Sequence, residues 1–266
     1  MKLDKIQTNR FTMNYCQFGH GSEPLVVLPG VSAQRVLNAA TAIEQAYQPL
    51  TDACTLVFLE RRNDMPAAYS VYEMAADTAE AIQALGLTSV NLFGASQGGM
   101  IAMKIAIDHP ERVKRLILGS SSASITDERY HSVFEPWVHL AKTGEREALN
   151  LSFGKAVYPA SVYEASRAFF VESAKAISDE DLKRFIAMTE GLRGFNVVDD
   201  LKKIACPVLV IGSRDDQVVG GDASPEIAAH LKNGQLYMYD HYGHAAYDVA
   251  PDYTQRLLRF IALERE

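Results

Sequence analysis

The chain has 266 residues, of which 48% are hydrophobic and 22% are charged, and it carries a net charge of −7. This balance is typical of folded globular proteins and excludes a largely disordered or collagen-like chain. At roughly 150 residues per domain, the length allows one or two domains.

Charge and cysteine placement exclude several classes of protein. The acidic balance, without a dense run of Lys or Arg, disfavours nucleic acid as a partner. The apolar stretches fall far short of the ~20 residues that a membrane helix needs, and charge precedes any hydrophobic stretch at the start, so we expect neither a membrane anchor nor a secretory signal. The cysteines, Cys16, Cys54 and Cys206, contain no Cys-x-x-Cys pair, which argues against a disulfide framework or a zinc site. A cytoplasmic protein is the resulting expectation.

Short apolar runs alternate with helical patterns through the first part of the chain. Strands are expected at residues 11–18, 25–28, 55–59, 90–93 and 116–119. The clearest helix runs from Ser70 to Leu85, because Ser70 and Glu73 form a capping-box pattern and Gly86 supplies a C-terminal stop. A second helix is expected over about 97–108. This alternation predicts an α/β fold whose mostly parallel sheet is flanked by helices.

The alternation breaks from about residue 123 to 203, where only helical periodicity is found. This segment holds 10 of the 24 aromatic residues, which either form the core of a small helical unit or line a ligand pocket, or do both. Strands are expected again at 207–212 and 235–239, and a last helix is expected from Pro251. The prediction is therefore a helical lid inserted into a single core.

In residue numbers, we expect the core to comprise 1–122 and 204–266 and the lid to comprise 123–203.

The sequence Gly94–Gly98 has the form Gly-x-Ser-x-Gly, with Ser96 at its centre. It lies between the strand expected at 90–93 and the helix expected from Gln97, which is the strand–turn–helix setting of a nucleophile elbow. Flanking glycines relieve the crowding of so sharp a turn. Ser96 is therefore the candidate nucleophile.

A serine hydroxyl becomes a good nucleophile only when a base accepts its proton. His244 follows the strand expected at 235–239 and so emerges at a strand's carboxyl end. His241 is the competing histidine, with a solvated loop position as its alternative interpretation. The His-x-x-His pair lacks the carboxylate of metalloprotease spacing and does not indicate a metal site.

The base in turn needs a carboxylate that holds its tautomer and stabilises the imidazolium. Asp215 and Asp216 follow the strand expected at 207–212. Position relative to the strand allows either aspartate to serve.

The order of these features resembles the α/β-hydrolase superfamily over essentially the whole chain, with Ser96 first, then the acid, then His244. The resemblance implies an Asp-x-Val-Val-Pro-like turn at the acid, and Asp216–Gly220 fits that register with glycine in place of proline. It therefore favours Asp216, although counting from Gly212 favours Asp215.

The resemblance also implies an oxyanion hole made by the backbone N–H groups of Val31 and Gln97. Family members often carry His-Gly after the early strand, whereas this chain has Pro29-Gly30. This departure keeps the glycine and loses the histidine. Arg61 and Arg62, after the strand expected at 55–59, are interpreted as a solvated loop pair, with an anion-binding role as the alternative.

The predicted function is that of a serine hydrolase acting on a small to medium carboxylic ester through an acyl-enzyme, without a metal or an organic cofactor. Two other classes stay open: a ligand-sensing protein on a hydrolase scaffold, and a cofactor-free lyase, oxygenase or C–C bond hydrolase. Lactone and thioester substrates also stay open. Turnover distinguishes an enzyme from a sensor, which would cleave its ligand slowly or once.

Overall fold

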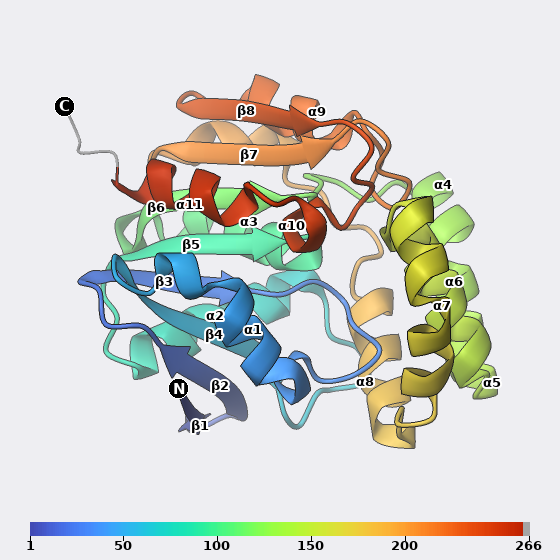
Figure 1. Ribbon diagram of the computed structural model, residues 1–266. Helices are drawn as coiled ribbons and strands as arrows, with labels where there is room; N and C mark the ends of the chain where they lie inside the picture. The colour runs from blue at the N-terminus through green and yellow to red at the C-terminus, as the bar shows by residue number, and fades with distance from the viewer. Residues whose placement is uncertain (263–266) are drawn as a thin grey trace.

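The computed structural model describes residues 1–262 and contains an eight-stranded sheet in the order β1-β2-β4-β3-β5-β6-β7-β8 (Figure 1). The strands are β1 (Lys2–Gln7), β2 (Thr12–Phe18), β3 (Glu23–Leu28), β4 (Cys54–Arg62), β5 (Val90–Ala95), β6 (Val113–Gly119), β7 (Val208–Ser213) and β8 (Gly234–Tyr239). Six neighbouring strands pair in parallel, namely β4, β3, β5, β6, β7 and β8. At one edge, β1 pairs antiparallel with β2, and β2 pairs antiparallel with β4. The predicted mostly parallel α/β sheet is confirmed. β1 was not among the expected strands, since its residues are mostly exposed and carry no apolar run.

Helices cover both faces of the sheet. The flanking helices are α1 (Ala40–Ala46), α2 (Val71–Ala84), α3 (Gln97–Asp108), α9 (Ala223–His230), α10 (Ala246–Val249) and α11 (Tyr253–Ala262). Short 3-10 turns are η1 (Val36–Ala39), η2 (Gln48–Leu50) and η3 (Pro110–Arg112). The capping box predicted for α2 is present, with Ser70 accepting a hydrogen bond from the N–H of Glu73.

Side chains of the central strand β5 alternate between two hydrophobic clusters. Leu92 packs in the cluster that contains α2 and α3, whereas Phe93 packs in the cluster that contains α11. The Phe93 and Tyr253 rings are 6.0 Å apart. A strand covered on both faces requires apolar residues at every position, which explains the continuous apolar run in the sequence. All six residues of β5 are buried.

The last helix begins later than expected. The N–H of Tyr253 donates to the carbonyl oxygen of Ala250, so that Pro251 and Asp252 form a turn before α11 rather than its first residues. Proline at the start of an apolar pattern fits both a first helical turn and the turn that precedes it.

Between β6 and β7 the chain is helical. It contains α4 (Asp127–Arg129), the π-helical turn η4 (Tyr130–Phe134), α5 (Glu135–Thr143), α6 (Arg146–Val157), α7 (Ala160–Ala174), α8 (Asp179–Glu190) and the 3-10 turn η5 (Val198–Lys203). The α4–α8 group stands beside the carboxyl ends of the parallel strands (Figure 1). We refer to residues 123–203 as the helical segment. None of the helices in residues 1–262 combines the length and the apolar character that crossing a membrane requires.

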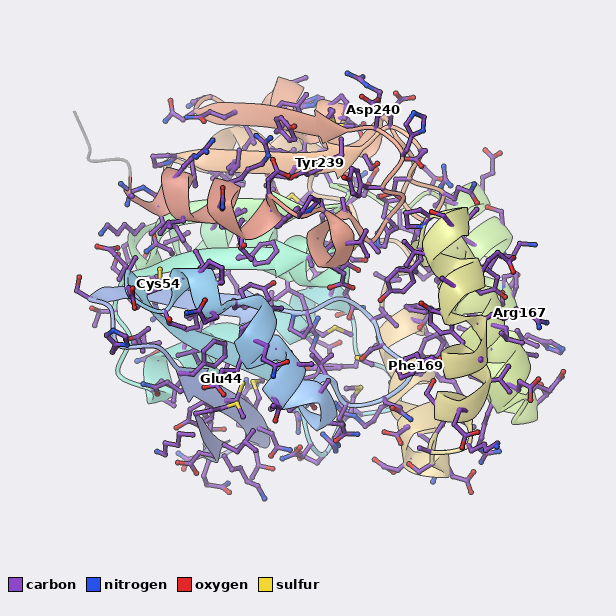
Figure 2. All side chains as sticks on the ribbon, in the orientation of Figure 1. Glu44, Cys54, Arg167, Phe169, Tyr239 and Asp240 are labelled. Carbon is purple, nitrogen blue, oxygen red and sulfur yellow. The ribbon has the colours of Figure 1, made fainter. Side chains whose placement is uncertain are left out.

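Aromatic side chains fill the interior of the helical segment. Trp137 lies 5.7 Å from Phe134 and 5.0 Å from Phe153, and Phe153 lies 6.2 Å from Phe185, measured between ring centroids. Phe169 is an exception, because 68% of it is exposed. It projects from the side of α7 that faces the core, opposite to Arg167 (Figure 2).

Candidate active site

Ser96 stands at a sharp turn between β5 and α3. Its φ of 53° and ψ of −122° lie outside the regions that non-glycine residues ordinarily adopt, and such strain concentrates at functional positions. A Cβ at Gly94 would lie 2.2 Å from the carbonyl oxygen of Gly98, and one at Gly98 would lie 2.0 Å from that of Leu28. Both flanking residues must therefore be glycine for the turn to form.

Two hydrogen bonds tie the backbone of Ser96 to the end of β6 and to the loop that follows it. Its N–H donates to the carbonyl oxygen of Gly119 at 2.8 Å. Its own carbonyl oxygen accepts from the hydroxyl of Ser121, also at 2.8 Å. These contacts hold the turn against the end of β6. They use only main-chain atoms of Ser96, not its hydroxyl.

His244 lies in the loop between β8 and α10. Its Nδ1 is 2.8 Å from Oδ2 of Asp216, and the two residues are only 2% and 6% exposed. A carboxylate oxygen is an acceptor, so the proton of the imidazole lies on Nδ1 and Nε2 is left as the basic atom. His241, the competing histidine, is exposed and makes no such contact.

The two adjacent aspartates have different partners. Oδ1 of Asp216 accepts hydrogen bonds from the N–H groups of Val218 and Val219 at 2.8 and 3.1 Å, which orients its other oxygen toward His244. Asp215 instead accepts from the Ser213 hydroxyl at 2.6 Å and from the Gly243 N–H at 3.1 Å. Burial acts to raise the pKa of Asp215, but these hydrogen bonds outweigh it and hold the pKa below its ordinary value.

Ser96 and His244 line one narrow cavity. Its walls come from the core and from the helical segment, and the segment contributes Phe134, Trp137, Phe153, Val157 and Leu192. Some of the aromatics predicted for this segment therefore line a cavity as well as packing against one another. The cavity therefore places a mainly apolar wall beside the serine.

The loop after β3 approaches Ser96 closely. A Cβ at Gly30 would lie 2.9 Å from Cβ and 3.5 Å from Oγ of Ser96, so glycine is needed for this approach. Val31 follows and lines the same cavity as Ser96. Gln97 is the first residue of α3, so its N–H has no acceptor inside the helix. Of the two expected oxyanion donors, Gln97 is therefore adjacent to the serine in the chain, and Val31 is close to it in space.

A family model described as alpha/beta hydrolase fold matches residues 49–251, which is more than half of the chain. The chain belongs to the α/β-hydrolase family. Among curated proteins, it is 27% identical over 199 residues to RutD of Caulobacter segnis, which is named as a candidate carbamate hydrolase, and the match covers 74% of each chain.

Solved structures of this family share the fold with this chain. MGS-M2, an alpha/beta hydrolase enzyme from a Medee basin deep-sea metagenome library, superimposes with a TM-score of 0.87 at 20% identity, covering 99% of this chain and 98% of the other. The enol-lactonase from Burkholderia xenovorans gives a TM-score of 0.84 at 17% identity, covering 98% and 100%. At the level that the family and these relatives share, the protein is a hydrolase on an α/β scaffold.

The sequence-based interpretation of Arg61 as half of a solvated loop pair is wrong. Both Arg61 and Arg62 belong to β4, and Arg61 is only 3% exposed. Its Nη2 donates to the carbonyl oxygen of Pro29 at 2.8 Å and approaches Oε1 of Gln97 at 3.4 Å. Desolvation lowers the pKa of Arg61 to about 10. In the sequence, the charged residues at 60–62 end the apolar run, so the predicted strand stopped at residue 59, whereas β4 continues to Arg62.

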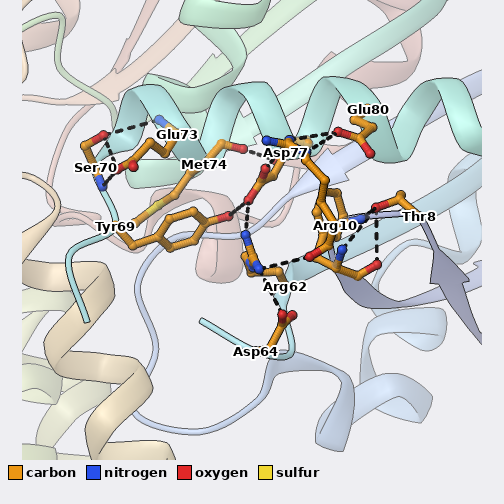
Figure 3. A network of polar contacts seen from close by, with 12 residues as sticks. Thr8, Arg10, Arg62, Asp64, Tyr69, Ser70, Glu73, Met74, Asp77 and Glu80 are labelled. Carbon is orange, nitrogen blue, oxygen red and sulfur yellow. Dashed lines mark hydrogen bonds and ion pairs between the residues drawn. The ribbon is translucent and has the colours of Figure 1, made fainter. Parts of the chain in front are cut away.

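Arg62 belongs to a separate polar network (Figure 3). It contacts Asp77 at 3.3 Å and Asp64 at 2.9 Å, and Asp77 also accepts from the hydroxyl of Tyr69 and from Arg10. This network fastens α2 to β4 and to the turn between β1 and β2. It contains none of the residues that line the cavity beside Ser96.

The side chain of Gln97 joins the catalytic turn to the helical segment. Its Nε2 donates to the carbonyl oxygen of Met188 in α8 at 2.6 Å. Gln97 was selected from the sequence for its backbone N–H alone, and no pattern in the sequence pointed to its side chain. α8 is further tied to β4, because Arg184 donates to the carbonyl oxygen of Arg62 at 2.9 Å and lies 3.6 Å from Glu60.

Proposed function

We propose that the chain is a serine hydrolase that cleaves a small to medium carboxylic ester through Ser96, His244 and Asp216. The observation that carries the proposal is the 2.8 Å contact between His244 Nδ1 and Asp216 Oδ2, with His244 and Ser96 in one cavity. Orientation of the imidazole by a buried carboxylate is what activation of a serine requires.

In the first half of the reaction, Nε2 of His244 accepts the proton of Ser96 while Oγ forms a bond to the ester carbonyl carbon. The resulting oxyanion accepts hydrogen bonds from the N–H groups of Val31 and Gln97. The bond to the alcohol oxygen then breaks, and His244 delivers its proton to the departing alkoxide. Asp216 stays ionised and stabilises the imidazolium.

In the second half, water attacks the acyl-enzyme. His244 accepts a proton from the water, the carbonyl oxygen again passes through an oxyanion, and the bond to Ser96 breaks. The proton returns to Oγ, which releases the carboxylic acid. No step needs a metal or an organic cofactor.

We further propose that the helical segment, residues 123–203, is a lid on a core formed by 1–122 and 204–266. Five of its residues line the cavity beside Ser96, which supports this proposal. Such a lid would exclude water during acylation and select the substrate by size.

Carbamates are a second candidate substrate class. The similarity to RutD of Caulobacter segnis, named as a candidate carbamate hydrolase, favours it. A carbamate carbonyl takes the same path, with a carbamoyl-enzyme in place of an acyl-enzyme. Matched 4-nitrophenyl acetate and 4-nitrophenyl carbamate distinguish the two, because they share one leaving group.

The test is labelling with a fluorophosphonate probe followed by mass spectrometry of the adduct. We expect an adduct on Ser96 in the wild-type protein and none in Ser96→Ala or His244→Ala. Ester hydrolysis should fall in parallel. A folded protein that shows neither an adduct nor ester turnover would overturn the proposal, and a single turnover without further product would favour a ligand sensor.

A further inference from the structure

A second, larger cavity lies next to the one that contains Ser96 and His244. Four residues line both cavities: Val31, Phe153, Val157 and Tyr247. One of these, Val31, is the proposed oxyanion donor. A substrate whose carbonyl lies at Ser96 therefore has a neighbouring space for the rest of its chain.

The walls of the second cavity are mainly apolar and aromatic. Tyr47, Phe58, Phe93 and Tyr247 contribute rings, and the rings of Tyr47 and Phe58 meet edge to face at 4.9 Å. An apolar arm of a substrate would be stabilised here by about 25 cal/mol for each Å² removed from water.

Among the residues that the structure describes, Asp248 is the one charged residue that lines this cavity. The hydroxyl of Tyr158 donates to its Oδ2 at 3.1 Å, and within residues 1–262 its Oδ1 receives no hydrogen bond and forms no ion pair. Asp248 is exposed, so that a ligand can reach its carboxylate. The titratable groups that interact with it are His244 and four tyrosines, Tyr47, Tyr158, Tyr247 and Tyr253, and within residues 1–262 no Lys or Arg lines the cavity.

Desolvation raises the pKa of Asp248 to about 6, against the opposing effects of the Tyr158 hydrogen bond and the charge of His244. The carboxylate thus stands at an apolar and aromatic wall without a cationic partner in residues 1–262. A cation placed beside it would form an ion pair, and the aromatic rings of the same cavity favour cations as well.

We propose that the second cavity binds the distal part of the substrate and that Asp248 selects an ester whose apolar arm ends in a cationic ammonium group. Asp248 is thus a specificity-determining residue, and the apolar walls hold the arm between it and Ser96. The inference rests on the proposed function of the Ser96 site and names its substrate class.

The kinetic test uses 4-nitrophenyl esters of hexanoic acid, 6-hydroxyhexanoic acid and 6-(trimethylammonio)hexanoic acid, which differ only at the end of the arm. In the wild-type enzyme we expect kcat/KM for the cationic ester to exceed that for hexanoate by at least tenfold. In Asp248→Asn this ratio should fall to about one. A wild-type ratio near one, or a preference that persists in Asp248→Asn, would overturn the proposal. A preference for the hydroxyl ester over the cationic one would also overturn it.

Asp252→Asn is the matched control. Asp252 is a nearby carboxylate that pairs with Arg256 at 2.5 Å and accepts from the Tyr239 hydroxyl, and it does not line the cavity. This variant should keep the wild-type ratio. A loss of preference in both variants would assign the effect to general electrostatics and contradict a specific role for Asp248.

A binding measurement separates this inference from the proposed hydrolase function. Ser96→Ala is titrated calorimetrically with hexyltrimethylammonium and with hexanol. We expect tighter binding of the cation and at least a tenfold rise in its dissociation constant when Asp248→Asn is added. If no ester is cleaved but this difference is found, the hydrolase proposal fails and the cation site stands. If esters are cleaved and the difference is absent, only the cation site fails.

Discussion

The carboxylate of Asp215 accepts a hydrogen bond of 3.1 Å from the main-chain N–H of Gly243, the residue immediately before His244. Asp216, the next residue, contacts the imidazole of His244 itself at 2.8 Å. The two adjacent aspartates thus have different roles: Asp215 fixes the backbone of the histidine loop, and Asp216 orients the imidazole ring.

This division predicts different losses on neutralising each carboxylate. Asp216→Asn should lower kcat by about 10⁴, because an amide can no longer hold the required tautomer. Asp215→Asn should lower kcat by only about tenfold, because a weaker hydrogen bond to Gly243 lets the loop shift. Steady-state hydrolysis of 4-nitrophenyl butyrate measures both. A larger loss in Asp215→Asn would reverse the assignment of the acid.

Gly30→Ala should impair catalysis more than folding. The added Cβ would lie 2.9 Å from Cβ of Ser96, so the loop that carries Val31 must move away. Since losing one oxyanion donor typically costs about 2.7–4 kcal/mol of transition-state stabilisation, we expect kcat to fall about 100-fold.

Gly194→Ala is the control for this prediction. It has a φ of +72° and no atom within 4 Å of the added Cβ, so it strains the backbone far from any contact. It should lower the melting temperature and leave kcat within twofold. Full activity in Gly30→Ala would contradict the proposed approach of the loop to the serine.

Arg61 and Arg62 offer a second matched pair. Arg61→Met removes the hydrogen bond to the carbonyl oxygen of Pro29, so we expect kcat to fall about tenfold as the oxyanion loop loosens. Arg62→Met leaves the cavity intact but removes a partner of the buried Asp77. It should destabilise the fold by about 1–3 kcal/mol and retain kcat. Chemical denaturation and steady-state kinetics on both variants test this, and equal effects on kcat would refute it.

The ionisation of Asp248 should make the stability of the folded protein depend on pH. Desolvation raises its pKa in the folded protein to about 6, above the roughly 3.9 of an unfolded aspartate. The folded state therefore holds this proton more tightly. Its contribution to stability is fully present below about pH 4 and is lost as the pH rises through 6.

Asp248→Asn has no carboxyl group to ionise at this position, so the variant should not lose this contribution to stability as the pH rises. We expect the melting temperature of the variant, relative to wild type, to become more favourable between pH 4.5 and pH 7.5, as measured by circular dichroism. The same relative melting temperature at both pH values would show that the folded-state pKa of Asp248 is not raised.

Much of the fold could be predicted because its signals are local. Apolar runs mark strands that are covered on both faces, and the Ser70 and Glu73 pair marks the start of α2. The site residues Ser96 and His244 could be selected because Ser96 follows one expected strand directly and His244 follows another after a short loop, and parallel strands bring such positions to one edge.

What could not be predicted depends on contacts between distant segments. The contact of Arg61 with Pro29 spans 32 positions, and that of Gln97 with Met188 spans 91. Position along the chain also could not separate Asp215 from Asp216. The separation depends on the two N–H groups of Val218 and Val219, which turn the Asp216 carboxylate toward the histidine.

The link between Gln97 and Met188 bears on how substrate reaches the serine. α8 is bonded to the catalytic turn through Gln97 and to β4 through Arg184, so an opening of the proposed lid that keeps these bonds would leave α8 in place. The moving part would then be α6 and α7, where Phe169 is 68% exposed (Figure 2). For the proposed lid, we therefore expect substrate entry and product release on the α7 side, with α8 stationary.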